Sequence, residues 1–409
     1  MFSFLKKLDK RQRFIVFTCF FAFFVNGQVS LMMGSFVPDL QANYGISGTV
    51  SGLLISAHSI GNLIAGFVSG LVPLLLGRKR SIICLHTLTF VGYAMIILFG
   101  NPVLLFLAFL LVGFGRGSVT NFNSRQINLL SDGSPAASNI MHAVFAIGAI
   151  IAPMVFLVLK RWIGWQAGLV WVILFGCVSL SNMMRMDLGA DDKPERADRT
   201  NRTLKFLKNP SFLIFCGMMF CYLCSEYSLN GWLVTYIQNK ENLVQALAES
   251  GTDTAAFSQS MATLLWSVML VGRLFCAALS GRVSQKMMML VASAGMAAFF
   301  AMLLLADSIP LVVAAVACMG FSMAGICPMI YSDAAVFTNA YPMATSMILG
   351  IGSIGGIVMP TLVGSLADAY GFNSGMGAIL VMVVLLVIFA LLNVAVKTRY
   401  MPEMKRPEK

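Results

Sequence analysis

The sequence predicts an all-α membrane protein, with twelve transmembrane helices arranged as two pseudo-symmetric halves of six helices each. Three observations support this prediction. Hydrophobic residues make up 58% of the 409-residue chain and charged residues only 11%, and the mean hydropathy is +0.83. Twelve apolar stretches are long enough to cross a bilayer, and short motifs of the first half recur in the second. A soluble protein would carry about 25% charged residues.

The spans follow from the length of the apolar stretches, because about 20 apolar residues cross a bilayer as a helix. They lie near 14–37, 50–73, 82–99, 103–127, 137–159, 162–183, 212–237, 259–280, 287–306, 311–335, 343–366 and 375–396. The long charged segment falls between spans six and seven. We therefore expect an N-terminal half at 1–183, a cytoplasmic linker loop at 184–211 and a C-terminal half at 212–409.

The charge distribution predicts the orientation. The formal net charge is +11, and most of the basic residues lie in the terminal segments, in 184–211 and in the loops after spans two and eight. Lys and Arg collect in cytoplasmic loops of membrane proteins, so both termini are expected in the cytoplasm, with the chain in a plasma membrane, the inner membrane of a bacterium. No soluble face is available for a nucleic-acid-binding patch, and we expect a monomer.

Internal repeats relate the two halves. Ile147-Gly148-x-Ile150-x-x-Pro153 matches Ile354-Gly355-x-Ile357-x-x-Pro360, and at the same offset Gly113-Phe114 matches Gly320-Phe321 and Lys79 matches Lys286. Such repeats predict two parallel six-helix halves with a site between them. The Gly–Pro pairs Gly148–Pro153 and Gly355–Pro360 are expected to permit the close helix approach and bending that gating requires.

The loop after span two carries a family signature. Gly70-Leu-Val-Pro-Leu-Leu-Leu-Gly77-Arg78-Lys79-Arg80 resembles the loop 2–3 motif of the major facilitator superfamily, and the segment from Ala277 to Lys286 is a weaker copy that contains Arg282. The resemblance covers the whole chain and implies the major facilitator fold, with Gly70, Gly77, Arg78, Lys79, Arg282 and Lys286 in gating roles. Leu74 and Leu75 stand where the family has an acid and a base, and Gly281 replaces the second acid. In the family this acid helps to lock a cytoplasmic gate by contacting helix ends. The sequence lacks the acid but keeps the basic residues Arg78 and Lys79.

Two shorter motifs resemble a group within that family. Asn139-x-x-His142 with Gly148 and Pro153, and Glu226-Tyr-Ser-x-x-Gly231-Trp232, look like the fucose–proton symporter group and its sugar-transporting relatives. This resemblance implies uptake of a monosaccharide together with a proton. The group's acid in the first span is absent from 14–37, which offers Asn26 and Gln28 instead.

Charged side chains inside spans are costly and usually functional. Arg116 and Glu226 are expected near mid-depth, and Arg273 lies deeper toward the cytoplasm. Glu226 can carry the coupling proton, because burial raises a carboxyl pKa toward neutrality, or it can accept hydrogen bonds from substrate hydroxyls. The alternative is a salt bridge with Arg116 or Arg273. Arg116 can grip a carboxylate or phosphate by two bonds, unless it pairs with Glu226.

Histidines, amides and tryptophans complete the candidate site. His142 and His58 are candidate proton relays, with buried neutral histidines bonded to a neighbouring helix as the alternative, which we favour for His86. Amides suit sugar hydroxyls but also join helices to one another. Trp232 and Trp266 can stack on a sugar ring or simply pack, and Glu226 and Trp232 share a face only if the helix breaks near Gly231. The amides in spans are Asn26, Gln28, Asn62, Asn121, Asn123 and Asn230.

These features favour a secondary active transporter that moves a small polar solute, a sugar, by proton-coupled symport with alternating access. The chain has no G-x-x-x-x-G-K-[ST] motif, so ATP-driven pumping is unsupported. We expect no enzymatic activity, no cofactor and no metal. Proton-driven efflux of drugs or organic anions is the alternative within transport, and a membrane sensor that moves no solute is the alternative from another class.

Overall fold

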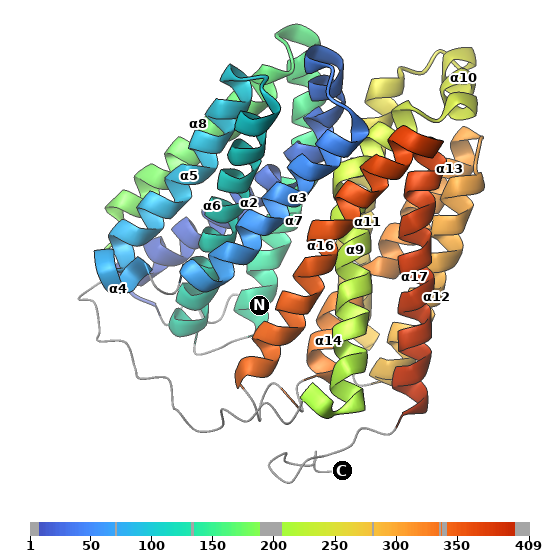
Figure 1. Ribbon diagram of the computed structural model, residues 1–409. Coiled ribbons are helices and arrows are strands. Elements are labelled where there is room, and N and C mark those ends of the chain that lie inside the picture. The colour runs from blue at the N-terminus through green and yellow to red at the C-terminus, as the bar shows by residue number, and fades with distance from the viewer. Residues whose placement is uncertain are drawn as a thin grey trace. The chain divides into compact units, whose positions relative to one another are not determined.

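The computed structural model describes residues 8–69, 72–131, 135–188, 207–279, 282–334, 337 and 342–396. Twelve helical segments in these ranges are long and apolar enough to cross a membrane, which confirms the predicted fold class (Figure 1). The helices are α2 (Lys10–Tyr44), α3 (Gly48–Val68), α4 (Val72–Leu76), α5 (Arg78–Leu98), α6 (Pro102–Leu130), α7 (Pro135–Trp162), α8 (Gln166–Arg185), α9 (Pro210–Gln238), α10 (Glu241–Glu249), α11 (Thr254–Leu279), α12 (Gln285–Leu305), α13 (Ile309–Met323), α14 (Ile326–Asp333), α16 (Pro342–Tyr370) and α17 (Phe372–Ala395).

The chain divides into two compact units. Unit 1 comprises Met1–Glu195 together with Ala255–Thr263, and unit 2 comprises Arg196–Thr254 together with Leu264–Lys409. The change from one unit to the other falls inside the predicted linker 184–211, of which 189–206 lie outside the described residues. The start of α11 groups with unit 1, although the sequence placed all of it in the C-terminal half.

Capping residues define where several helices begin. Asp9 and Gln12 form a capping box at the start of α2, which satisfies two backbone N–H groups that have no partner within the helix. Asn101 and Asn209 cap α6 and α9 with their side-chain oxygens, which accept from backbone N–H groups of the first turn, and in both helices a proline follows at the first helical position. Proline is favoured there because its missing N–H would have no helical partner.

The first, second and tenth predicted spans differ from the structure. The second, predicted at 50–73, ends with α3 at Val68, and Val72–Leu76 form the separate helix α4. The first span, predicted at 14–37, is the helix α2 from Lys10 to Tyr44, which continues through Pro38 and ends at Gly45 in the left-handed conformation (φ 62°). The prediction ended too early because Pro38 and Asp39 interrupt the apolar stretch. The tenth span consists of α13 and α14 with a break between them. Pro328 explains this break, because it has no N–H to donate to the residue four positions earlier.

In unit 1, glycines allow two pairs of helices to pack backbone to backbone. Helix α2 packs along α7 and α3 packs along α6. A Cβ on Gly148 would overlap the carbonyl oxygen of Phe24, and a Cβ on Gly113 would overlap that of His58. The prediction that Gly148 permits close helix approach is confirmed, since a larger residue there would force the two helices apart.

Unit 2 repeats this packing with the equivalent helices. Helix α9 packs along α16, and a Cβ on Gly355 would lie 2.6 Å from the carbonyl oxygen of Phe220. Gly320 of α13 approaches the carbonyl oxygen of Leu265 in α11, where a Cβ would lie 2.7 Å away. The glycines that matched in sequence therefore serve the same kind of helix contact in each unit.

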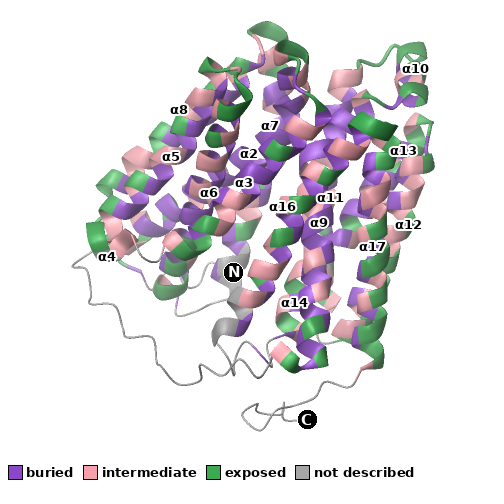
Figure 2. Cartoon of the chain, in the orientation of Figure 1, coloured by how far each residue is buried: buried purple, intermediate pink, exposed green. Residues whose placement is uncertain are grey.

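Burial follows the position of each helix within its unit. The most apolar window of α9 is 72% buried, whereas the windows of α12 and α17 are only 28% buried. Figure 2 shows this contrast: α9 is buried along most of its length, and α17 carries exposed residues on its outer side. Helix α9 is therefore the helix of unit 2 whose polar residues are most enclosed by protein.

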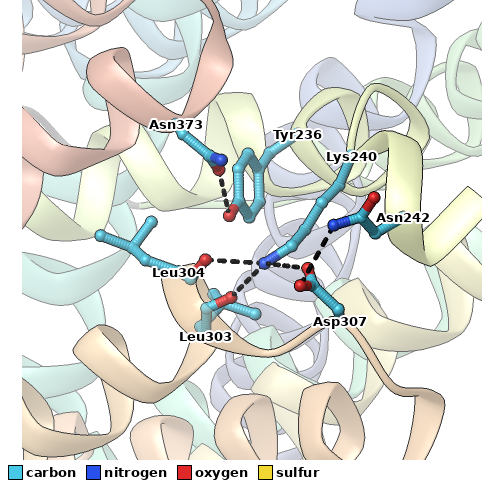
Figure 3. A network of polar contacts seen from close by, with 7 residues as sticks. All are labelled: Tyr236, Lys240, Asn242, Leu303, Leu304, Asp307 and Asn373. Atoms are coloured by element: carbon cyan, nitrogen blue, oxygen red, sulfur yellow. Dashed lines mark hydrogen bonds and ion pairs between the residues drawn. The ribbon is translucent and has the colours of Figure 1, made fainter.

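A buried lysine of unit 2, Lys240, contacts the C-terminal end of α12 (Figure 3). Lys240 follows α9, its side chain is 5% exposed, and its Nζ atom donates to the carbonyl oxygens of Leu303 (3.1 Å) and Leu304 (2.8 Å) at the end of α12. Asp307 lies 3.6 Å from the same nitrogen and accepts a hydrogen bond from Asn242. The last carbonyls of a helix carry partial negative charge, so a cation stabilises them. Burial lowers the pKa of Lys240, and Asp307 acts in the opposite direction.

Candidate functional site

Arg116 is the centre of a polar cluster in unit 1. It lies in α6, is half-buried, and donates from Nε to the hydroxyl of Ser30 (2.5 Å) and from Nη1 to Oδ1 of Asn62 (3.3 Å). Its guanidinium also lies over the ring of Phe145, 5.8 Å from the centroid. These contacts come from α2, α3 and α7, so the folded unit brings four helices to one cation. We call Arg116, Ser30, Asn62, Phe145 and the neighbouring His58 the Arg116 cluster.

His58 lies within electrostatic range of Arg116. Its side chain is buried, and neither ring nitrogen has a hydrogen-bond partner among the described residues. His142 is exposed and meets Phe23 edge to face, with ring centroids 5.8 Å apart. His86 is buried, and its Nε2 lies 3.0 Å from the hydroxyl of Ser179 in α8, which is the structural contact favoured for this residue.

Most of the candidate amides of unit 1 are engaged between helices, whereas the buried side chain of Asn123 has no hydrogen-bond partner among the described residues. The side-chain nitrogen of Asn26 donates to the hydroxyl of Thr120 (2.8 Å) and the carbonyl oxygen of Arg116 (3.3 Å). Gln28 accepts from the indole of Trp171 (2.9 Å), and Asn121 donates to Ser69 (3.1 Å). Each of these bonds joins two different helices, so the amides hold α2, α3, α6 and α8 together.

Glu226 is the centre of a second cluster, which lies in unit 2. It is half-buried in the middle of α9, and the hydroxyls of Tyr222 and Tyr331 and the thiol of Cys327 lie within its electrostatic range. Arg273 of α11 interacts with Tyr222 and Cys327 as well. These five residues form the Glu226 cluster. The structure therefore places a carboxylate, a guanidinium and three groups that are weak acids in one neighbourhood of unit 2.

The tryptophans differ in accessibility and partners. Trp266 donates to Oδ1 of Asn230 (3.1 Å) and lies 5.9 Å from the guanidinium of Arg273, so it borders the Glu226 cluster. Trp232 is fully buried and donates to the carbonyl oxygen of Pro360 (3.1 Å). Helix α9 is continuous through Gly231, so the break that would bring Trp232 onto the face of Glu226 is not present.

Several of the predicted gating residues lie at or near the start of a helix. Gly77 precedes α5 at φ 77°, a left-handed conformation that side chains with a Cβ rarely adopt, and Arg78 and Lys79 begin that helix. Lys286 begins α12 and donates to the carbonyl oxygen of Asn393 (2.8 Å) at the end of α17, while Arg282 is exposed. Gly70 lies outside the described residues.

The proline of each Gly–Pro pair lies inside a helix. Pro153 is within α7 and Pro360 is within α16. Both are buried. A proline inside a helix removes one backbone hydrogen bond and favours bending at that point.

Sequence reasoning missed one charged pair. Asp39 is buried in the last turns of α2, and its Oδ1 lies 2.6 Å from Nζ of Lys160 in α7. The first span therefore extends to an acid that lies outside the predicted range 14–37. The signal was present, because Pro38 and Asp39 directly follow the apolar stretch and a helix can continue through a proline. Within the described part of the chain, no group of three or more His, Cys, Asp and Glu residues is placed to hold a metal ion.

The comparisons with known proteins agree with this architecture. A family model described as Major Facilitator Superfamily matches residues 19–335. Membrane protein MosC of Rhizobium meliloti is 23% identical over 361 residues, which covers 86% of this chain and 84% of MosC.

The crystal structures of the nucleoside transporter NupG are similar to this structure. A mutant form has a TM-score of 0.75 at 16% identity over 94% of this chain and 99% of NupG. A second NupG structure has a TM-score of 0.67 at 15% identity over 95% and 99%. At these identities the likeness shows a shared fold. Because the family model covers most of a chain with twelve candidate spans, this protein is an integral membrane transporter rather than an enzyme, and it belongs to the major facilitator superfamily.

Proposed function

We propose that this protein is a secondary active transporter that takes up a small hydroxylated solute, a sugar, together with a proton. The observation that carries the proposal is Glu226. A carboxylate in the middle of a spanning helix costs at least about 2.5 kcal/mol on insertion scales and is rarely kept for packing alone. Glu226 is half-buried rather than fully enclosed, and the proposal requires that water reaches it so that it can exchange a proton.

The surroundings of Glu226 support a proton-carrying role. Tyr222, Tyr331 and Cys327 are neutral groups with a proton to donate, and they lie on two helices, α9 and α14. Such groups stabilise a carboxylate by hydrogen bonding without the fixed charge that would prevent its protonation. In this proposal the carboxyl group changes its charge during the transport cycle.

The residues near Glu226 suit a ring bearing hydroxyl groups. Asn230 lies one helical turn beyond Glu226 on the same face of α9, and it is held by the indole of Trp266. An indole offers a flat apolar surface for a sugar ring, and an amide offers both a donor and an acceptor. NupG is by its name a nucleoside transporter, and a nucleoside contains a sugar, which favours the same class of solute.

Alternating access would use the glycine contacts of α2 with α7 and of α9 with α16, where close packing and an internal proline allow bending. We place both termini in the cytoplasm and the protein as a monomer in the inner membrane of a bacterium, on the distribution of basic residues.

Uptake by proteoliposomes under an imposed pH gradient tests the proposal. We expect Glu226→Gln to abolish accumulation of the transported sugar while solute exchange continues, because exchange requires no net proton movement. Glu241→Gln is the matched control, since Glu241 is an exposed acid at the start of α10 in the same unit. Unchanged accumulation in Glu226→Gln would remove this residue from proton coupling.

The same assay separates the alternatives. If no sugar accumulates and expression protects cells against toxic compounds, the protein is an efflux transporter. If no solute moves in either direction, it is a sensor.

A further inference from the structure

Arg116 is a charged residue in the interior of a spanning helix, and it is not sealed from solvent. It lies in the middle third of α6 (Pro102–Leu130) and is half-buried. A charged side chain at this depth is expensive and normally faces a cavity or a charged partner. The question is which negative charge compensates this guanidinium.

The partners of Arg116 within its unit are all neutral. Nε and Nη1 donate to Ser30 and Asn62, and the flat face of the guanidinium lies over Phe145. Within the described part of the chain, Nη2 makes no hydrogen bond. A guanidinium has five N–H donors, so the side chain is fixed in position by two bonds while most of its donors stay available.

The described helices of unit 1 offer Arg116 no unpaired acid. In the described helices α2 to α8, the only carboxylate is that of Asp39, and it is bound to Lys160 at 2.6 Å. The titratable groups that face Arg116 from neighbouring helices are His58 of α3 and Tyr93 of α5. Tyr93 donates its hydroxyl proton to the carbonyl oxygen of Val29 (2.9 Å), so it is also neutral there. Among the described residues of unit 1, the positive charge of Arg116 therefore has no counter-charge.

We propose that the solute itself supplies this counter-charge, and that Arg116 binds a carboxylate group of a hydroxylated monoanion, a sugar acid. This inference rests on the proposed function, because it specifies the class of the transported sugar. A guanidinium presents a planar pair of donors that matches the two oxygens of a carboxylate. Ser30 and Asn62 hold it in place, so the donors are preorganised before the solute arrives.

A carboxylate fits this site better than a phosphate does. One guanidinium among neutral groups compensates a single negative charge, whereas a phosphate monoester carries nearly two at neutral pH. The other cation of α6, Arg125, is exposed and lies more than two helical turns further along the helix. A second positive charge for a phosphate is therefore missing from the cluster.

Thermal stabilisation of the purified full-length protein tests the proposal, with D-galacturonate and D-galactose as matched probes and inorganic phosphate as the third ligand. The two sugars differ in the carboxylate at one carbon atom. We expect galacturonate to stabilise the wild-type protein, and Arg116→Gln to weaken that binding by at least about tenfold, as the loss of one charge-assisted pair implies. Arg125→Gln is the control and should bind as the wild type does.

Three results would overturn the proposal. The first is equal stabilisation by both sugars with an equal loss for both in Arg116→Gln, which would make Arg116 a structural residue. The second is stabilisation by phosphate but not by galacturonate, which would assign the cation to a phosphorylated solute. The third is no response to galacturonate in the wild type. Arg116→Lys, which keeps the charge but not the planar fork, guards against misfolding of Arg116→Gln and should retain weaker binding.

Failure of this inference is distinguishable from failure of the proposed function. If galacturonate binding depends on Arg116 but Glu226→Gln still accumulates solute under a pH gradient, proton coupling through Glu226 is wrong and the carboxylate site stands. If a neutral sugar is accumulated through Glu226 and galacturonate does not bind, the symport proposal stands and the carboxylate site is wrong.

Discussion

Replacing Lys240 with methionine should destabilise unit 2, because the lysine side chain caps the carbonyl groups at the C-terminal end of α12. Methionine has nearly the same length and apolar volume, so the change removes the ammonium and little else. The substitution removes the hydrogen bonds from the ammonium to the carbonyl oxygens of Leu303 (3.1 Å) and Leu304 (2.8 Å). It also removes the ion pair with Asp307. Two acceptors at the end of α12 would then lack their protein donor.

The magnitude follows from the burial of each partner. A hydrogen bond to a charged group contributes about 1.5–3 kcal/mol, so the two bonds together are worth about 3–6 kcal/mol before the cost of burying the ammonium is subtracted. That cost is several kcal/mol for an isolated charge, which leaves a net loss of about 1–3 kcal/mol. Asp307 is 54% exposed, and an exposed ion pair contributes about 0–1 kcal/mol. Asp307→Asn should therefore cost much less than Lys240→Met.

The measurement is the half-time of aggregation of purified protein in detergent on heating, since large membrane proteins unfold irreversibly. A loss of about 2 kcal/mol shortens this half-time by up to about 30-fold. Lys208→Met is the matched control, because Lys208 is exposed in the same unit. If Asp307→Asn were as damaging as Lys240→Met, the ion pair rather than the helix-end contact would dominate, and the reasoning would be refuted.

The contribution of Lys240 should also depend on pH. Its pKa is lowered from 10.5, chiefly by burial, so at alkaline pH the native protein binds fewer protons than the unfolded chain. Stability then rises with pH in the window between the lowered pKa and 10.5. The difference in unfolding free energy between wild type and Lys240→Met should therefore widen as the pH rises through that window. A constant difference would contradict the claim that burial lowers the pKa of Lys240.

Two further predictions concern unit 1. Gly148→Ala should destabilise the protein by about 1–3 kcal/mol because its Cβ would overlap the carbonyl oxygen of Phe24. The control is Gly350→Ala, which should be neutral or stabilising because no atom lies within 4 Å of the new Cβ. Equal effects of the two substitutions on thermal unfolding would argue against backbone contact at Gly148. Lys160→Met should cost about 3–5 kcal/mol because it leaves the buried carboxylate of Asp39 unpaired. Asp39→Asn should cost at most about 1 kcal/mol because the side chain of Lys160 is 35% exposed and can turn to water. If a stability assay showed a larger loss for Asp39→Asn than for Lys160→Met, the cation would be the buried partner.

Several features of the fold could be predicted from the sequence. The twelve spans follow from hydropathy, because a helix that crosses a bilayer must be apolar over about 20 residues whatever it packs against. The close approach at Gly148 and Gly355 followed from the repeat, since only glycine allows two backbones to meet.

The site was only partly predictable. Arg116 and Glu226 were recognised because a charge inside an apolar stretch is visible in the sequence, but their neighbours were not. Ser30 and Asn62 meet Arg116 from two other helices, and Tyr331 reaches the range of Glu226 from α14. Nothing local in the sequence distinguishes these residues from other polar residues in spans.

The sequence by itself therefore determined which segments are helices and which of them carry a charge, because the cost of placing backbone and charge in lipid acts on each segment separately. The tertiary structure alone decided which polar groups meet. It placed Asp39 beside Lys160, turned Lys240 onto the end of α12 and buried Trp232 against Pro360. Those contacts depend on how helices far apart in the chain rotate against one another, and the packing of glycines and large side chains sets that rotation.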